Sequence, residues 1–294
     1  MKKTIKKQFA FTLIELLIVI AIIGILSALI IVGMNNATQK ATIAKAQVFS
    51  NSLRNSLMSG LFAEYKLDGN ASDTWGTHTA GTISGASSYA SCIQNTCYSF
   101  DSDDDYIELA DVADLRMITG GTISVWIYPK SYGEGTLGRI IDKSSSGDSG
   151  LGGYTFRNSS LNRLLFVIND GTNTLTQQNV ITYNQWQLVT TTFNDSGRKI
   201  YVNGIDKTAS GGNETDLPPD STGIVVRIGN SAYGTTRTFD GYIDDVQIYN
   251  QVIPTSQIQQ NYYAGLNKLF ANRGVEISEY QQCLTELSNN YAQQ

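Results

Sequence analysis

The chain has 294 residues, of which 16% are charged, and it contains one histidine and three cysteines. This charged fraction is below the roughly 25% of an average soluble domain. One histidine excludes a histidine-rich metal site. The 26 acidic residues outnumber the 21 basic ones, which argues against a nucleic-acid-binding protein.

The N-terminal region contains the only long apolar segment of the sequence. Four lysines lie within residues 1–10, and residues 11–33 then include a single charged residue, Glu15. As a helix, this segment spans about 34 Å, enough to cross a bilayer. A cleaved secretory signal is the alternative, but its apolar core usually has only about 7–15 residues. The sequence therefore predicts a membrane helix at 11–33 with its N-terminus in the cytoplasm.

Glu15 is the unusual residue of this helix, because an unpaired carboxylate inside a membrane is costly and marks a functional position. The lysine-rich leader followed by Ala10-Phe11-Thr12-Leu13-Ile14-Glu15-Leu16 resembles the N-terminus of type IV prepilins and pseudopilins. The resemblance implies that an inner-membrane prepilin peptidase cleaves between Ala10 and Phe11, although the family usually has Gly before the cut. It also implies N-methylation of Phe11 and pairing of Glu15 with the terminal amine of a neighbouring subunit.

Removal of residues 1–10 would change the charge balance of the chain. Four lysines are lost, so 17 basic residues remain against 26 acidic ones, and the net charge moves from −5 to −9. The polar segment that follows Gly33 has apolar residues at near-helical spacing, among them Ile43, Leu53 and Leu57. We expect one helix over 11–60 whose second half is amphipathic and ends near Gly60. A generic membrane-proximal linker helix explains this pattern almost equally well.

The segment 61–266 changes to short β-branched and aromatic runs separated by Gly, Asn, Asp and Ser, which is typical of an all-β sandwich. Asn203-Gly204 between two such runs predicts a tight hairpin. Predicted strands are Thr122–Tyr128, Arg163–Ile168, Gln187–Phe193, Ile224–Ile228 and Tyr242–Tyr249.

Four segments of this region resemble the concanavalin A-like, laminin-G-like jelly-roll family. They are Tyr65–Asp73, Phe100–Leu109, Asn184–Val189 and, most specifically, Phe239–Asn250, which a short helix near 255–262 follows. Trp75 and Gln187 depart from the residues common in that family. The fold class predicted is therefore α+β, with a long N-terminal helix, a jelly roll at 61–266 and a helical tail at 267–294.

Related sandwiches include glycoside hydrolases, which need two carboxylates about 5–9 Å apart. The nearest match is Glu214-Thr215-Asp216, which has loop-like neighbours and no second Glu at the required spacing. Catalysis that depends on histidine would rely on His78 alone, which we expect in an exposed loop. We therefore predict that the chain is not an enzyme and has no organic cofactor.

The jelly-roll resemblance also implies a structural calcium ion between the opening loop and the last strand. The corresponding oxygen donors are Asp68, Asn70, Asp73 and Asp244, which suit the oxygen preference of Ca²⁺. The alternative is that these are solvated turn residues. The acidic run Asp101, Asp103, Asp104 and Asp105 is interpreted as a solvated turn.

Sugar recognition requires exposed aromatic rings beside polar groups. Four aromatic residues in loop-like sequence are the candidates for glycan binding: Trp75, Tyr132, Tyr154 and Tyr233. Trp126 and Trp186 lie in predicted strands, so we expect them in the core. This signal is weak because 16 tyrosines also suit a purely structural outer surface.

Cys92 and Cys97 enclose four residues, and in an exported domain we predict a disulfide between them. Cys283 remains, in a tail where Ile277, Tyr280, Leu284, Leu287 and Tyr291 recur at helical spacing. The tail is predicted to pack against its own domain or against a neighbouring subunit.

Together these features predict a structural subunit of a type IV pilus-like filament. It would be a single-pass protein of the inner membrane before assembly and a part of a surface filament afterwards. Expected partners are further copies, other pilins, the assembly machinery and a glycan or surface protein bound by the jelly roll. The alternatives are a pseudopilin or minor pilin of a type II secretion or DNA-uptake machine and, less favoured, a membrane-anchored glycan-active enzyme.

Overall fold

A computed structural model describes residues 60–294, except 77, 147–151, 170–172, 273–274 and 292–294. The predicted leader, membrane helix and amphipathic helix, with Ala10, Phe11 and Glu15, lie outside the described residues. Among the helices that are described, none is long and apolar enough to span a membrane.

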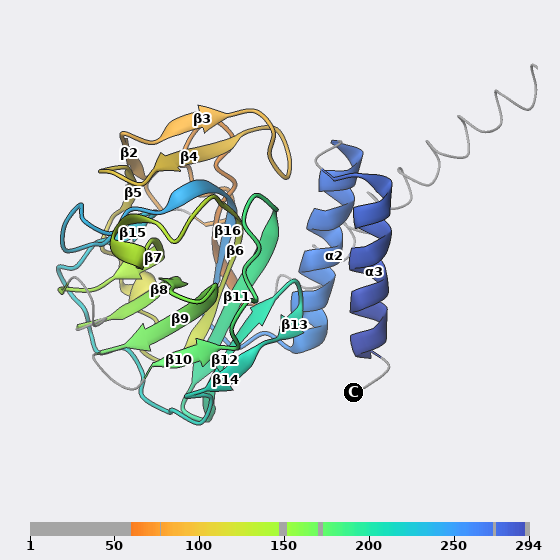
Figure 1. Cartoon of the computed structure of the whole chain (residues 1–294). Helices are drawn as coiled ribbons and strands as arrows, with labels where there is room; N and C mark the ends of the chain where they lie inside the picture. The colour runs from red at the N-terminus through yellow and green to blue at the C-terminus, as the bar shows by residue number, and fades with distance from the viewer. Residues whose placement is uncertain (1–59, 77, 147–151, 170–172, 273–274, 292–294) are drawn as a thin grey trace, which may run out of the picture. The chain divides into compact units, whose positions relative to one another are not determined.

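Two antiparallel sheets of eight strands each make up the described β region (Figure 1). In spatial order, sheet A consists of β13 (Ile205–Asp206), β12 (Gly197–Val202), β11 (Gln187–Asn194), β6 (Gly121–Pro129), β16 (Asp240–Tyr249), β4 (Cys97–Asp101) and β3 (Ser87–Tyr89), and β1 (Leu61–Tyr65) pairs with β16. Sheet B consists of β14 (Thr208–Ser210), β10 (Thr174–Thr176), β9 (Arg163–Ile168), β8 (Tyr154–Ser159), β7 (Arg139–Lys143), β15 (Val226–Ile228), β5 (Tyr106–Leu109) and β2 (Thr82–Ser84).

The predicted β sandwich is confirmed, and most predicted strands appear within a residue or two of their expected ends. Asn203 and Gly204, with φ of 53° and 78°, form the predicted turn between β12 and β13. Strand β15 is shorter than expected. Its predicted first residue, Ile224, instead closes a turn by donating its N–H to the carbonyl of Ser221.

The core lies between the two sheets and is rich in aromatic side chains. Alternation along each strand places one set of residues inside, as for Ile127 on β6 and Ile243 on β16. The largest apolar side chains of this core include Phe100, Tyr154, Phe156, Phe166, Phe193 and Phe239. The residues that alternate with them on sheet A face outward and include the carboxylates described below.

Two helices follow the last strand and lie side by side in Figure 1, α2 (Thr255–Ala271) and α3 (Ile277–Tyr291). Helix α2 is longer than the short helix predicted at 255–262, because no proline interrupts the sequence before Ala271. It covers part of the outer face of sheet A, where Tyr262 stacks on Trp126 with 5.7 Å between ring centroids. Tyr280 and Leu284 of α3 pack against the same cluster, so the described part of the tail packs against its own domain.

Candidate functional site

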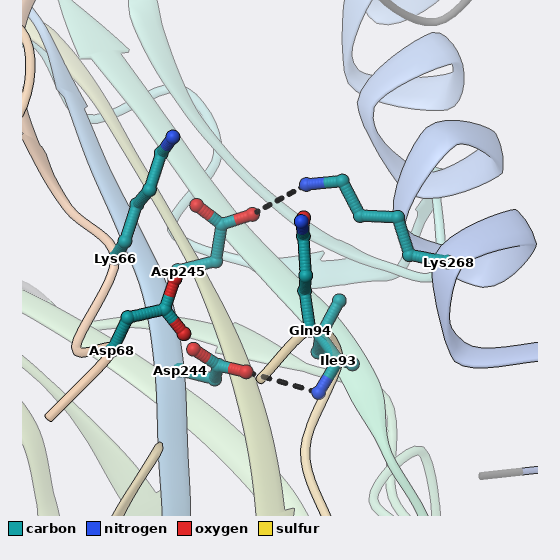
Figure 2. A pocket seen from close by; sticks show the side chains of 7 residues that line it. All are labelled: Lys66, Asp68, Ile93, Gln94, Asp244, Asp245 and Lys268. Atoms are coloured by element: carbon teal, nitrogen blue, oxygen red, sulfur yellow. Dashed lines mark hydrogen bonds and ion pairs between the residues drawn. The ribbon is translucent and has the colours of Figure 1, made fainter. Parts of the chain in front are cut away.

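A small pocket on the outer side of sheet A gathers three carboxylates (Figure 2). The carboxylates of Asp68, Asp244 and Asp245 lie close together around a cavity of about 10 Å³, which is room for one water molecule or ion. The other lining residues are Lys66, Ile93, Gln94 and Lys268. With all three acids ionised, three carboxylates against two lysines give the pocket one excess negative charge.

A β-bulge in β16 explains why two consecutive residues contribute to one pocket. Asp244 pairs with Trp126 and Gln247 pairs with Ser124, so β16 has one more residue than β6 over this interval. Asp245 takes a left-handed φ of 47° within the bulge. In a regular strand, Asp244 and Asp245 would point to opposite faces of the sheet.

The loop closed by the Cys92–Cys97 disulfide forms the second wall of the pocket. This disulfide confirms the predicted pairing. The loop donates the Ile93 N–H to Asp244 Oδ2 at 3.0 Å and the Thr96 N–H to Asp68 Oδ1 at 3.2 Å. The two cysteines therefore stabilise the loop that holds both carboxylates, and their sulfurs are not available as metal ligands.

The pocket places carboxylate charge where water has little access. Asp244 is only 2% exposed. Its burial, followed by the nearby charges of Asp245 and Asp68, raises its pKa well above the ordinary range. Asp245 Oδ1 is also buried and accepts no hydrogen bond from a described residue. An unsatisfied oxygen beside two further carboxylates fits a bound cation, whose charge would reverse the rise in the pKa of Asp244.

Two of the four predicted calcium ligands, Asp68 and Asp244, line this pocket, whereas Asn70 and Asp73 do not. Asn70 Oδ1 accepts the Ser72 N–H at 2.9 Å in an exposed turn. The pocket instead includes Asp245, which the sequence analysis missed. The two consecutive acids in Tyr242–Tyr249 could have indicated an irregular strand at this point, because they break the alternation expected of a strand.

Asp73 holds the opening loop against β1. Its Oδ1 accepts backbone N–H groups of Glu64, Trp75 and Gly76, each at 3.0 Å. Burial opposes ionisation, but these bonds and that of His78 outweigh it and lower the pKa of Asp73. Asp73 Oδ2 lies 2.6 Å from His78 Nδ1. His78 also packs edge-on against Phe62. It lies in a loop, as predicted, but its side chain is only 14% exposed, so the expected exposure is wrong.

The acidic run 101–105 is a turn, as predicted, but its last member is not solvated. The Asp103 N–H donates to Asp101 Oδ1, and both residues are exposed, as is Asp104. Asp105 is 6% exposed and accepts the Asp101 N–H. Burial is the main reason why its pKa rises to about 6.

The predicted glycan-binding aromatics lie in different environments. Trp75 is exposed and donates its indole N–H to the Leu61 carbonyl, Tyr233 is 70% exposed, and Tyr132 is half-buried against Tyr183. Tyr154 is fully buried on β8, and its hydroxyl donates to the Leu115 carbonyl. The assignment of Tyr154 to an exposed loop is therefore wrong, and no ring contact among the described residues joins two of these four side chains.

The two other tryptophans differ from each other. Trp126 is buried under α2, as predicted. Trp186 lies one residue before β11 and is only half-buried, because it faces outward rather than into the core. Glu214, Thr215 and Asp216, the only approach to a hydrolase motif, lie in the loop between β14 and β15.

Comparison with known proteins finds one family and one short motif. Residues 101–259, more than half of the chain, match a family described as the concanavalin A-like lectin/glucanases superfamily. Residues 5–31 match the prokaryotic N-terminal methylation motif. Both predicted resemblances are confirmed, and no curated protein matches the chain.

Solved structures share the fold at low sequence identity. Domain 4 of AbnA, a GH43 extracellular arabinanase from Geobacillus stearothermophilus in complex with arabinotriose, is 18% identical with a TM-score of 0.52. The match covers 68% of this chain and 97% of that domain.

Two toxin domains are also similar. The binding domain of Paraclostridial Mosquitocidal Protein 1 is 14% identical, with a TM-score of 0.54 and coverage of 71% of this chain. The ligand binding domain of botulinum neurotoxin serotype D, in complex with N-acetylneuraminic acid, is 16% identical, with a TM-score of 0.53 and coverage of 73% of this chain. This chain covers 53% of each of these structures, and the likeness concerns the fold.

Proposed function

The chain belongs to the concanavalin A-like lectin/glucanases superfamily, and we propose that it is the subunit of a type IV pilus-like surface filament that displays this domain as a binding head. One observation carries the proposal. The methylation motif at 5–31 and the lectin-like domain at 101–259 occur in the same chain. The first region provides a means of polymerisation, and the second provides a fold used for binding.

The assembly step rests on three residues of the N-terminal motif. Cleavage after Ala10 frees the amine of Phe11, and the four lysines that hold the leader in the cytoplasm are removed. Glu15 is the only acid of the apolar segment, and a cationic amine from the next subunit neutralises it where no water is present. The precursor thus resides in the inner membrane and the mature chain in a surface filament, together with other copies or other pilins.

The second candidate is a minor pilin or pseudopilin of a type II secretion or DNA-uptake machine. The same motif at 5–31 favours it, because cleavage, methylation and helix assembly are common to both classes. The two candidates differ in abundance and location. If the chain is a filament subunit, antibody to the head labels long surface fibres along their length. If it is a machine component, the label remains at the cell envelope or at a filament tip.

The head is proposed to bind a glycan or a surface protein. Two domains of similar fold are described in complex with sugars, one with arabinotriose and one with N-acetylneuraminic acid. A single calcium ion is proposed in the pocket of Asp68, Asp244 and Asp245, because these oxygens provide the ligand type that Ca²⁺ prefers. There it would hold the opening loop, the disulfide loop and the last strand together.

The test is assembly of a Glu15→Val variant, with Ser27→Ala in the same helix as the matched control. We expect the valine variant to insert into the membrane and to be cleaved but to form no filaments, while the control assembles normally. Immunogold labelling of the head counts the surface filaments, and membrane fractionation measures insertion. Normal filaments from the valine variant would refute the proposal, and labelling confined to the envelope would favour the secretion or uptake machine.

A further inference from the structure

A row of aromatic side chains crosses the outer face of sheet A beside the carboxylate pocket. The row consists of Trp186, Tyr128, Tyr242 and Tyr89 and is called the aromatic row below. Tyr242 on β16 pairs directly with Tyr128 on β6, and both point away from the core because their neighbours Ile243 and Ile127 are fully buried. The row is therefore a consequence of strand register.

The rings contact one another along the row. Trp186 and Tyr128 have centroids 5.6 Å apart, and Tyr128 and Tyr242 have centroids 5.3 Å apart. Tyr89 lies nearly parallel to Tyr242, with 4.2 Å between centroids and 9° between planes. These contacts hold each ring in place before any ligand arrives, which lowers the entropy lost on binding.

The helices cover the neighbouring row of the same face and reach only the Trp186 end of the aromatic row, where Trp186 packs against the helix-covered cluster. Two residues away from the pair Tyr242–Tyr128, Asp244 on β16 pairs with Trp126 on β6. Trp126 lies in the helix-covered cluster, and Asp244 lies in the carboxylate pocket. In the aromatic row, by contrast, Tyr89 is 39% exposed, and Tyr128, Trp186 and Tyr242 are half-buried. One exposed ring continued by three half-buried rings offers a ligand a contiguous aromatic surface.

Charges of both signs lie near the row. Lys130 places its ammonium 4.3 Å from the centre of the Tyr242 ring. The pKa of Tyr128 is raised mainly by burial, and the opposite charges of Lys130 and Glu279 then shift it in opposite directions. Asp240, two residues before Tyr242 on β16, adds a second acid on this face. A surface with charges of both signs and several phenol hydroxyls suits an uncharged ligand that has apolar faces and many hydroxyl groups.

From this arrangement we propose that the aromatic row is the binding platform of the head and that its ligand is a neutral polysaccharide. The apolar faces of the sugar rings stack on the aromatic row, while the phenol hydroxyls, Lys130 and nearby backbone groups bind the sugar hydroxyls. The inference rests on the proposed binding function and specifies the site and the ligand class. Residues from β3, β6 and β16 and the residue just before β11 meet in it, so the site requires the folded sheet.

The test uses the full-length chain in detergent and pull-down on immobilised arabinan, xylan, mannan and laminarin, with hyaluronan and polysialic acid as anionic probes. We expect binding to at least one neutral polysaccharide and none to the anionic ones. Tyr89→Ala should weaken binding by roughly tenfold or more. Tyr89 is on an exposed edge strand, so this variant keeps the fold. Ile83→Ala, at an exposed position on β2 at the edge of sheet B, is the matched control that should bind normally.

A second readout follows Trp186 directly. Titration with a soluble oligosaccharide of the bound polymer should change the tryptophan emission of the wild type, and Trp186→Phe should abolish that change while Trp75 and Trp126 still fluoresce. No binding to neutral polysaccharides, binding to anionic ones alone, or equal binding by Tyr89→Ala would overturn the platform. The platform would also be overturned if Tyr89→Ala lost self-association of the chain but kept glycan binding, because the row would then only mediate contact between copies.

Filament counts on the same variants separate this inference from the proposed function. Tyr89→Ala strains should assemble filaments as the wild type does. Filaments that are present without row-dependent glycan binding refute the platform alone. Glycan binding that needs the aromatic row in a protein that forms no filaments refutes the filament proposal alone.

Discussion

Asp244 Oδ2 accepts the N–H of Ile93 at 3.0 Å, and this bond joins the last strand of sheet A to the disulfide loop across 151 positions of sequence. The bond needs Asp244 as an acceptor, yet Asp245 and Asp68 surround the same carboxylate with like charge. Lys268 Nζ, 3.6 Å from Asp245 Oδ2, offsets part of this charge. The rest is relieved either by protonation of Asp244 or by a cation between the three acids. The first prediction distinguishes these.

Calcium is expected to raise the melting temperature by roughly 5–10 °C at about a hundredfold excess over its Kd. Asp244→Asn should lose this response. Without calcium it should be at least as stable as the wild type, because a neutral amide needs no protonation to sit beside Asp245 and Asp68 and its oxygen can still accept the Ile93 N–H. Asp104→Asn, in an exposed turn, is the control and should respond like the wild type. Thermal unfolding with calcium and with a chelator measures the effect, and an identical melting temperature in both would rule out the ion.

A second prediction concerns pH and Asp105. Burial raises its pKa from 3.8 to about 6, so the folded protein holds a proton there that the unfolded chain has already lost. The free energy of unfolding therefore falls as the pH rises from about 4 to about 6, and we expect a contribution of about 1–2 kcal/mol. Asp105→Asn should remove this slope. The check is urea unfolding as a function of pH, with Asp104→Asn as the control; a slope unchanged in Asp105→Asn contradicts the assignment.

How much of the site was predictable depends on which interactions place each residue. Asp68 and Asp244 followed from the resemblance of the opening loop and the last strand to a known family. Asp73 did not join them, because three backbone N–H groups and His78 bind its carboxylate elsewhere. Residue type alone does not indicate which backbone groups a carboxylate meets. The position of Asp245 in the pocket depends on a β-bulge, which changes the face of every later residue in the strand.

The aromatic residues show the same limit. The strands could be predicted from the alternation of apolar and polar residues. The aromatic row could not, because it depends on the register of β16 on β6 and of β11 on β6, and these strands are far apart in sequence. Tyr154 was misplaced for a local reason. The glycines that precede it indicated a loop, whereas Gly153 is needed because a Cβ there would meet the Lys143 carbonyl at 1.8 Å.

The third prediction tests the docking of α2 on sheet A at Gly265. A Cβ at this position would lie 2.3 Å from Cζ2 of Trp126, so Gly265→Ala forces the helix away from the indole. Alanine favours the helix by up to about 1 kcal/mol, but overpacking costs about 1–3 kcal/mol, and we expect a net loss of stability. Gly234→Ala, whose added Cβ has no neighbour within 4 Å, should be neutral. Urea unfolding measures both, and a stabilised Gly265→Ala protein would show that α2 does not pack as described.

The last prediction links the disulfide to the pocket. Replacing Cys92 and Cys97 with serine frees a loop that donates N–H groups to Asp244 and Asp68. The closed loop is short, so we expect a loss of about 2 kcal/mol in unfolding free energy, and calcium affinity should fall at the same time because the second wall of the pocket is no longer held. Cys283→Ser is the control, since Cys283 is a free thiol.

Denaturant unfolding and calcium titration of the double serine variant provide the two readings. A loss of stability with unchanged calcium affinity would mean that the disulfide supports the fold without organising the pocket. If neither quantity changes, the loop is held by its hydrogen bonds alone, since the Asn272 side chain also donates to the Ile93 carbonyl at 2.9 Å. An Asn272→Ala change on the serine background should then release the loop and lower the calcium affinity.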